Sequence, residues 1–306
     1  MNTRDVKLVV ILGPTASGKT QLAVEVAKRI NGAIISADSR QVYRGMDLGT
    51  GKDLEIYGDI PYYLIDVVEA GETYHVSRYR EDVYEALDAI QERGKQPILC
   101  GGTGLYIQSV VQGFEYDGVP VNAALRDALE PHSIETLTAR LVHLPMPPGF
   151  KPDTSTKKRL IRAIEIAEWC QAHLLPARPR PAPDAAIFGI NPPVESRRQR
   201  ITARLRLRLD KGLLDEVKAL LQSGVAKERL TYYGLEYKYA TQYLSGEMDE
   251  STFFSRLNTE IHRFAKRQMT YFRKMEKDGL RIQWLNQGTV NEMADEVLTM
   301  LRGKPA

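Results

Sequence analysis

The stretch Gly13-Pro14-Thr15-Ala16-Ser17-Gly18-Lys19-Thr20 matches the phosphate-binding loop pattern G-x-x-x-x-G-K-[ST]. Apolar β-branched residues precede it over Val6–Leu12, and apolar residues recur at helical spacing after it over Gln21–Ile30. A strand, a glycine-rich turn and a helix in this order are the context that the motif requires. The glycines allow backbone N–H groups to turn inward, Lys19 adds a point charge, and Thr20 can hold Mg²⁺. The stretch therefore predicts a site for a diphosphate or a triphosphate.

Short β-branched runs alternate with helical stretches through the first third of the chain. The predicted strands are Val6–Leu12, Ala33–Ser36, Tyr62–Val67 and Pro97–Cys100. The predicted helices between them are Gln21–Ile30 and Ser77–Glu92, and Gly32 and Gly94 stand where these helices would stop. The alternation predicts a parallel sheet with crossover helices, which is an α/β core.

A helical segment interrupts this core. From about Gly113 to Ala177 the pattern is helical, and the proline-rich stretch Pro176–Pro183 then leads back to a weaker strand, Ala186–Ile190. After Pro193 the predicted elements are helices over Val194–Leu209, Leu213–Gln222, Tyr237–Leu244 and Asp249–Lys274, and a strand over Arg281–Trp284. We therefore expect a core of residues 1–112 and 184–306, with a helical subdomain and its linker, residues 113–183, inserted into it.

Composition excludes several classes of protein. The chain has 306 residues, 43% of them apolar, which argues against disorder and suffices for roughly two domains. The longest apolar stretch near the start, Val9–Leu12, is far shorter than the ~20 residues of a membrane span, so we expect no membrane contact. Cys100 and Cys170 are too few for a disulfide framework. Since Met1–Lys7 also lacks the pattern of a secretory leader, we expect a cytoplasmic protein.

Basic residues are concentrated in one block. Residues 157–208 hold twelve Lys or Arg against four acidic residues, a net charge of +8, whereas the whole chain carries +3 and the remainder therefore −5. Such a block fits a phosphate-rich partner such as a nucleic acid, and it fits a solvated helical face equally well on charge alone.

Two further clusters stand at predicted strand ends, where open α/β sheets bind ligands. Asp38, followed by Ser39-Arg40-Gln41-Val42-Tyr43, could hold a metal ion or take a proton from a substrate amine, or it could be a helix-capping or loop aspartate. The acid of Leu64-Ile65-Asp66 is a second candidate for a metal-binding carboxylate. Gly101-Gly102-Thr103-Gly104-Leu105-Tyr106 suggests close approach of the backbone to a ligand beside the Thr103 hydroxyl, although a tight turn into a helix would use the same glycines.

In this order, the three clusters resemble the tRNA dimethylallyltransferases, also called tRNA isopentenyltransferases. The resemblance continues, up to about residue 285, in Lys158-Arg159-Leu160-Ile161-Arg162, in Arg200-Ile201 with Arg204, in Gly212-Leu213-Leu214-Asp215-Glu216-Val217, and in Ala265-Lys266-Arg267-Gln268 followed by Thr270-Tyr271-Phe272-Arg273. Other phosphate-loop enzymes share only the first cluster. The resemblance implies a P-loop NTPase-like parallel sheet core with an inserted helical subdomain and a helical C-terminal region.

The resemblance also implies an activity and its site. The family transfers a dimethylallyl group from dimethylallyl diphosphate to the N6 amine of the adenosine that follows the anticodon of tRNA. By this similarity, residues 13–20 hold the diphosphate with Mg²⁺ at Thr20, and Arg204 is a candidate for a further diphosphate contact. Asp38 corresponds to the general base and Thr103 to a threonine beside the reacting centre. The segments Asp38-Ser39-Arg40-Gln41 and Lys158-Arg159-Leu160-Ile161-Arg162 fall where the family contacts tRNA, and we expect a monomer.

The sequence departs from the family pattern at several positions. Tyr62 and Tyr63 stand where the family often has two histidines, and Tyr233-Gly234-Leu235-Glu236-Tyr237 replaces its Gly-Tyr pair. Leu144-Pro145-Met146-Pro147-Pro148 interrupts the segment where a longer helix is expected. These departures leave room for a different adenine acceptor, as in a prenyltransferase for free adenine nucleotides. Two further alternatives are a small-molecule kinase that uses ATP at the same loop and an RNA-binding protein that has lost the reaction.

Overall fold

The structure, a computed structural model, describes residues 7–113, 116, 118–174 and 180–303. They belong to two compact units, one of residues 1–112 with 183–306 and one of residues 113–182, and each unit has its own apolar core. Within the described residues, the helices fall short of the length and apolar character that a membrane crossing requires.

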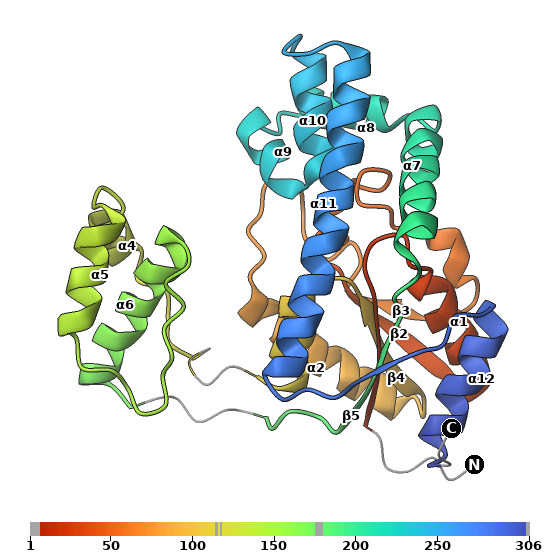
Figure 1. The fold of residues 1–306 in the computed structure, drawn as a ribbon, viewed down its shortest axis with the longest axis horizontal. Helices are drawn as coiled ribbons and strands as arrows, with labels where there is room; N and C mark the ends of the chain where they lie inside the picture. Colours follow the sequence, from red (N-terminus) through yellow and green to blue (C-terminus); the bar gives the residue numbers. More distant parts are fainter. Residues whose placement is uncertain (1–6, 114–115, 117, 175–179, 304–306) are drawn as a thin grey trace. The chain divides into compact units, whose positions relative to one another are not determined.

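Six parallel strands form one sheet in the larger unit, in the order β3-β2-β4-β1-β5-β6 (Figure 1). Their bounds are β1 Leu8–Leu12, β2 Gly32–Ala37, β3 Tyr62–Tyr63, β4 Gln96–Gly101, β5 Ala185–Gly189 and β6 Ile282–Trp284. This sheet confirms the predicted α/β fold with a P-loop NTPase-like parallel core.

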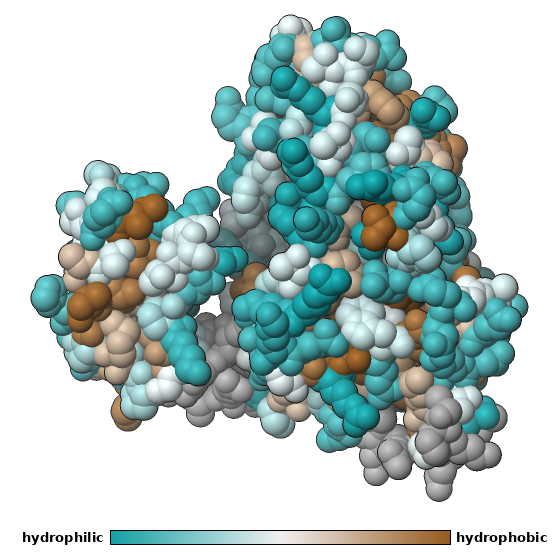
Figure 2. All heavy atoms as spheres, viewed as in Figure 1, coloured by the Kyte–Doolittle hydropathy of each residue, from teal (hydrophilic) through white to brown (hydrophobic). Residues whose placement is uncertain are grey.

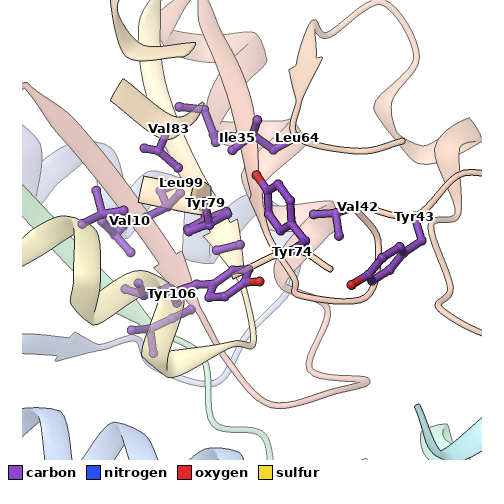
Figure 3. Packing of buried hydrophobic residues seen from close by; sticks show 14 of the residues in the cluster. Val10, Ile35, Val42, Tyr43, Leu64, Tyr74, Tyr79, Val83, Leu99 and Tyr106 are labelled. Atoms are coloured by element: carbon purple, nitrogen blue, oxygen red, sulfur yellow. The ribbon is translucent and has the colours of Figure 1, made fainter. Parts of the chain in front are cut away.

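Alternate residues of the central strands face two different helical layers. In β1, Val9 and Ile11 pack with the residues of α1, Lys19–Ile30, and α12, Val290–Leu301. Leu8, Val10 and Leu12 belong instead to the cluster on the other face, with α2, Val76–Glu92, and α3, Gly104–Val111. In this second cluster Tyr79 and Tyr106 stack with ring centroids 3.9 Å apart (Figure 3). Both faces of the sheet are therefore buried, as expected for parallel strands.

Helices also make up the C-terminal region. They are α7 Val194–Asp210, α8 Leu213–Gln222, α9 Lys227–Tyr233, α10 Leu235–Leu244 and α11 Glu250–Lys277. Buried residues of α11 recur every three or four positions, as in Leu257, Ile261 and Ala265, so one face of this long helix is buried, partly against α3 and α10. The sequence did not predict α3, α9 or α12.

Two local predictions were wrong. The strand predicted over Tyr62–Val67 is only Tyr62–Tyr63, because Leu64 and Asp66 adopt left-handed conformations with φ of 60° and 58°. The helix stop predicted at Gly32 lies instead at Asn31, the C-cap residue of α1, which takes the left-handed conformation with φ of 52°, while Gly32 is already the first residue of β2. The stop predicted at Gly94 agrees with its φ of 63° just after α2.

The smaller unit contains α4, Ala123–Leu129, α5, Ile134–His143, and α6, Lys157–Ala172. Its helices begin at side-chain caps from Asn122, Ser133 and Thr156, and its core is made of leucine and isoleucine residues from all three helices. Figure 2 shows apolar patches on this unit. The linker predicted over Pro176–Pro183 lies partly outside the described residues.

Candidate active site

The register of the sheet brings the three sequence clusters together. Leu12 of β1 and Ala37 of β2 both pair with Gly101 of β4. Because the strands are parallel, the residues that follow, Gly13, Asp38 and Gly102, leave the sheet at the same edge. Asp38, Gly102 and the phosphate-loop residue Thr15 border a cavity of about 520 Å³ in the larger unit.

The predicted phosphate loop contributes Thr15, Lys19 and Thr20 to the cavity lining. Its other predicted residues shape the turn. Gly18 has φ of 88° directly before α1, and a Cβ at Gly13 would lie 2.6 Å from the Ser17 hydroxyl oxygen. That hydroxyl is buried and has no hydrogen-bond partner among the residues that the structure describes. The loop geometry thus agrees with the predicted phosphate site.

Lys19 and Asp38, which follows β2, both line the cavity. Its ammonium group is 3.5 Å from the Pro14 carbonyl oxygen. Burial lowers the pKa of Lys19 below its ordinary value, and the neighbouring Cys100 and Asp38 act in the opposite direction. Burial also raises the pKa of the Cys100 thiol to about 12, so this cysteine is neutral and its interior position is structural.

Thr103 holds the loop of Asp38 in place at the cavity. The Asp38 carboxylate accepts the backbone N–H of Arg40 at 3.0 Å, which leaves its second oxygen for another partner. The Thr103 hydroxyl accepts the backbone N–H of Ser39 at 3.1 Å. Asp38, Ser39 and Thr103 all line the cavity. The two predicted catalytic residues therefore share one surface, connected through Ser39.

Arg40 and Gln41 complete this wall of the cavity. The Arg40 guanidinium lies 5.3 Å from the centre of the Tyr232 ring, and that ring is half exposed. The Gln41 side chain accepts the Ser36 hydroxyl at 3.0 Å and donates to the Gly51 carbonyl at 3.0 Å. Arg40 can thus meet a substrate, whereas the Gln41 amide is already engaged within the protein.

The glycines of the third cluster serve packing inside the protein. A Cβ at Gly101 would lie 2.1 Å from the Ala37 carbonyl oxygen, one at Gly102 would lie 2.4 Å from Gln268, and one at Gly104 would lie 2.3 Å from the Tyr271 ring. These contacts fit the interpretation of the glycines as a tight turn. The same glycines and Thr103 also line the cavity, so their role in the approach of a ligand stays a prediction.

Two arginines of α7, Arg204 and Arg208, line the cavity. Arg204 donates to the Gly51 carbonyl at 3.1 Å and pairs with Asp53 at 2.5 Å. Arg208, which the sequence analysis missed, pairs with Glu236 at 3.3 Å, and its buried Nε has no partner within the described chain. The signal for Arg208 was its spacing of four residues from Arg204, which places both on one face of a helix.

The departure at Tyr233-Gly234-Leu235-Glu236-Tyr237 borders the cavity, because all of these residues except Tyr237 line it. Tyr237 is buried and donates to Glu216 at 2.6 Å. The Tyr233 hydroxyl accepts the backbone N–H of Gly71. Tyr62 and Tyr63 pair with β2 at the sheet edge, outside the cavity lining.

The second predicted tRNA segment lies on α6 of the smaller unit. Lys158 and Arg159 are exposed. Leu160 and Ile161 are buried in the core of this unit, so the prediction that they contact tRNA does not fit their positions. Arg162 contacts the buried Glu165 and donates to the Val119 carbonyl at 2.8 Å, which gives it a structural role.

The second candidate for a metal-binding acid, Asp66, forms an ion pair with the buried Lys52 and lies outside the cavity lining. Groups of three or more His, Cys, Asp or Glu suited to a metal ion are absent from the part of the chain that the structure describes. Thr20 and Asp38 nevertheless give the cavity two oxygen donors of the kind that Mg²⁺ prefers when a phosphate supplies further ligands.

The parallel sheet and the phosphate loop define a P-loop protein in which Asp38 and Thr103 line the same cavity as the loop. Residues 41–275 match the family model described as IPP transferase. The chain belongs to the tRNA dimethylallyltransferase family, which confirms the resemblance seen in its motifs.

Individual relatives match nearly the whole chain. The chain is 44% identical to "tRNA dimethylallyltransferase 2" of Shewanella sediminis over 97% of its own length and 99% of that protein. It is 49% identical to "tRNA dimethylallyltransferase 2" of Syntrophotalea carbinolica over 91% of its own length and 94% of that protein.

Solved structures agree with the fold. A tRNA isopentenylpyrophosphate transferase from Bacillus halodurans superposes with a TM-score of 0.71, 30% identity and coverage of 97% of both chains. A eukaryotic dimethylallyltransferase acting on tRNA gives a TM-score of 0.76 over 97% of this chain and 80% of the other, and at 22% identity this likeness shows the fold alone.

Proposed function

We propose that this protein transfers a dimethylallyl group from dimethylallyl diphosphate to the N6 amine of the adenosine that follows the anticodon in tRNA. Membership of the family supports this activity. The observation that carries it is the convergence of Lys19, Asp38 and Thr103 on one cavity. A leaving diphosphate and an amine nucleophile need these groups on opposite sides of the reacting carbon.

The donor half of the reaction belongs to the phosphate loop. When the allylic C–O bond breaks, negative charge builds up on the departing diphosphate. Lys19, the N-terminus of α1 and the arginines at 204 and 208 supply positive potential on that side of the cavity. This positive potential stabilises the developing charge without any change of protonation in the protein.

Mg²⁺ is part of the proposal for the donor half. Thr20, at the start of α1, is the residue that would hold it together with diphosphate oxygens. When bound, the ion neutralises charge on the diphosphate.

The acceptor half belongs to Asp38. The N6–C bond forms as the C–O bond breaks, the diphosphate departs with the bonding electron pair, and the amine must then lose one proton. In this proposal one carboxylate oxygen of Asp38 takes that proton, and the bond from the Arg40 N–H to the other oxygen at 3.0 Å supports this role. Thr103 orients the acceptor through its hydroxyl.

The exposed basic residues of α6 extend the proposal to the RNA. Lys158 and Arg159 can contact phosphates, which position a nucleic acid independently of its sequence. The helical unit of residues 113–182 is thus proposed as a tRNA-binding unit. Since tRNA is the acceptor, a cytoplasmic location follows from the proposal.

The acceptor can be identified in one assay. The protein is incubated with Mg²⁺ and labelled dimethylallyl diphosphate, and either bulk tRNA or AMP is added. The proposal expects label in tRNA. Label in AMP alone would favour the nucleotide prenyltransferase, and phosphoryl transfer from ATP without prenylation would favour the kinase.

A further inference from the structure

A glutamine lies on the buried face of α11, among apolar residues. Gln268 is 7% exposed, and its neighbours on that face, Ala265, Met269 and Phe272, all belong to the apolar core. An amide in such a place must find hydrogen-bond partners or it destabilises the fold.

Both ends of the Gln268 amide are satisfied by loops of the active site. Its carbonyl oxygen accepts the backbone N–H of Thr15 at 2.8 Å, and its NH₂ group donates to the Gly102 carbonyl at 2.9 Å. Thr15 belongs to the phosphate loop, and Gly102 directly precedes Thr103. One side chain from a distant helix therefore connects the loop for the donor with the loop beside the acceptor.

The two backbone partners determine which side chain this position accepts. An N–H can only donate and a carbonyl can only accept, so the position needs one acceptor and one donor at a fixed separation. Glutamine supplies both groups. Glutamate would place a second oxygen against the Gly102 carbonyl, and an apolar residue would leave both backbone groups unpaired.

The packing around Gly102 supports the same conclusion. A Cβ at Gly102 would lie 2.4 Å from Nε2 of Gln268, so the loop approaches the amide as closely as a glycine allows. The cavity lining includes Gln268 together with Thr15 and Thr103.

We propose that Gln268 is a positioning residue that sets the distance between the phosphate loop and Thr103, and thereby between the donor and the acceptor amine. This inference rests on the proposed prenyl transfer. A misplacement of about 1 Å between reacting groups can cost on the order of 10²-fold in rate. The loss should therefore affect the chemical step more than the binding of either substrate.

The first test compares two variants in α11. Gln268→Met keeps the volume and removes both hydrogen bonds. Asn258→Leu is the matched control, because Asn258 accepts the Thr202 hydroxyl at 3.1 Å and lies outside the cavity lining. The readouts are single-turnover prenyl transfer with saturating substrates, affinity for inorganic diphosphate, and thermal stability.

We expect Gln268→Met to slow single-turnover transfer by about 10- to 100-fold while its diphosphate affinity stays within about threefold. Asn258→Leu should retain the wild-type rate. If both variants lose similar stability and both keep the wild-type rate, Gln268 is only structural and the inference is overturned. An inactive wild-type protein would instead contradict the proposed function.

The second test uses Gln268→Glu and remains decisive if Gln268→Met does not fold. At neutral pH the introduced carboxylate can accept from Thr15 but repels the Gly102 carbonyl. Protonation restores a donor, so the rate of the variant relative to wild type at the same pH should rise as the pH falls. A ratio independent of pH, or a wild-type rate at neutral pH, would overturn the inference.

Discussion

Lys19 is the positively charged side chain that the phosphate loop itself contributes to the proposed donor site. Lys19 is partly enclosed, and burial lowers its pKa, an effect that Cys100 and Asp38 oppose. The ammonium group lies 3.5 Å from the Pro14 carbonyl oxygen of the same loop and lines the cavity. In the proposed reaction it is the loop's own side-chain cation for the departing diphosphate.

Lys19→Ala should lower the turnover of prenyl transfer by orders of magnitude and weaken the binding of dimethylallyl diphosphate, because the leaving group loses its nearest charge. Steady-state kinetics and calorimetric titration with inorganic diphosphate measure the two effects. Lys218→Ala, which removes an exposed lysine paired with Asp215 at 3.0 Å, is the control. Unchanged turnover in Lys19→Ala would mean that the loop binds something other than the donor.

Asp38 differs from Lys19 because its proposed role is in proton transfer and not in binding the diphosphate. Asp38→Asn keeps an acceptor for the Arg40 N–H but cannot take the amine's proton. We expect the rate of single-turnover transfer to fall by roughly 10² to 10⁴, the range of a positioned base, with diphosphate affinity within a few-fold. If the affinity for donor in the presence of Mg²⁺ falls in step with the rate, the carboxylate holds metal instead.

At the scale of elements, the sequence predicted the central strands and most long helices because their periodicity is strong. The prediction of a strand over Tyr62–Val67 failed because the apolar pattern does not show that Leu64 and Asp66 adopt left-handed conformations. Asp66 forms an ion pair with the buried Lys52, a contact that the pattern also does not show. The helix α12 had a detectable signal, because Thr289 and Glu292 form a capping box.

Glu165 is the polar centre of the helical unit. It is 2% exposed and accepts bonds from Arg126 at 2.8 Å, from Arg162 and from the Asn122 N–H at 2.6 Å. Burial acts to raise the pKa of Glu165, but these bonds together hold it below the ordinary value. The stabilisation is therefore complete above the unfolded-state pKa of about 4.3 and is lost as the pH falls through the folded-state value.

Glu165→Gln should lower the free energy of unfolding of this unit by about 3 kcal/mol at pH 7, because it leaves arginine charges with a neutral partner. The difference from wild type should shrink below about pH 4. Since the chain has two tryptophans, a Trp284→Phe background leaves Trp169 on α6 as the fluorescence probe for urea unfolding.

Glu168→Gln, which breaks a more exposed pair with Arg140, should cost at most about 1 kcal/mol. An equal effect of the Glu165 and Glu168 variants would contradict the central role of Glu165.

The exposed side of α6 gives a separate prediction about RNA. Lys158→Ala combined with Arg159→Ala should weaken tRNA binding and reduce the slope of log affinity against log salt by about one to two units. Arg162 is left intact because its bonds to Glu165 and Val119 stabilise the unit. Binding measured over a salt series checks this.

The control for the α6 pair is Lys211→Ala with Lys218→Ala, which removes two exposed lysines of the other unit. A wild-type salt slope in the α6 double variant would mean that this basic face is only solvated.

At the scale of the whole molecule, the sequence located the site but not the residues that hold it together. The P-loop, Asp38 and Thr103 belong to local sequence motifs that follow predicted strands. Because these strands are parallel, the residues that follow them lie at one edge of the sheet. Gln268 and Arg208 reach that edge from helices more than 100 positions further along the chain. Their contacts depend on tertiary packing, which periodicity does not encode.

The central claim is that the cavity of the larger unit places a prenyl group on one adenine amine of tRNA. Its most direct test compares two tRNA transcripts that differ only in the nucleotide after the anticodon, adenosine in one and guanosine in the other. Both receive the enzyme, Mg²⁺ and labelled dimethylallyl diphosphate. We predict label in the adenosine transcript, recovered as N6-prenylated adenosine by nucleoside mass spectrometry, and none in the guanosine transcript. Equal label in both transcripts, or none in either, would contradict the account.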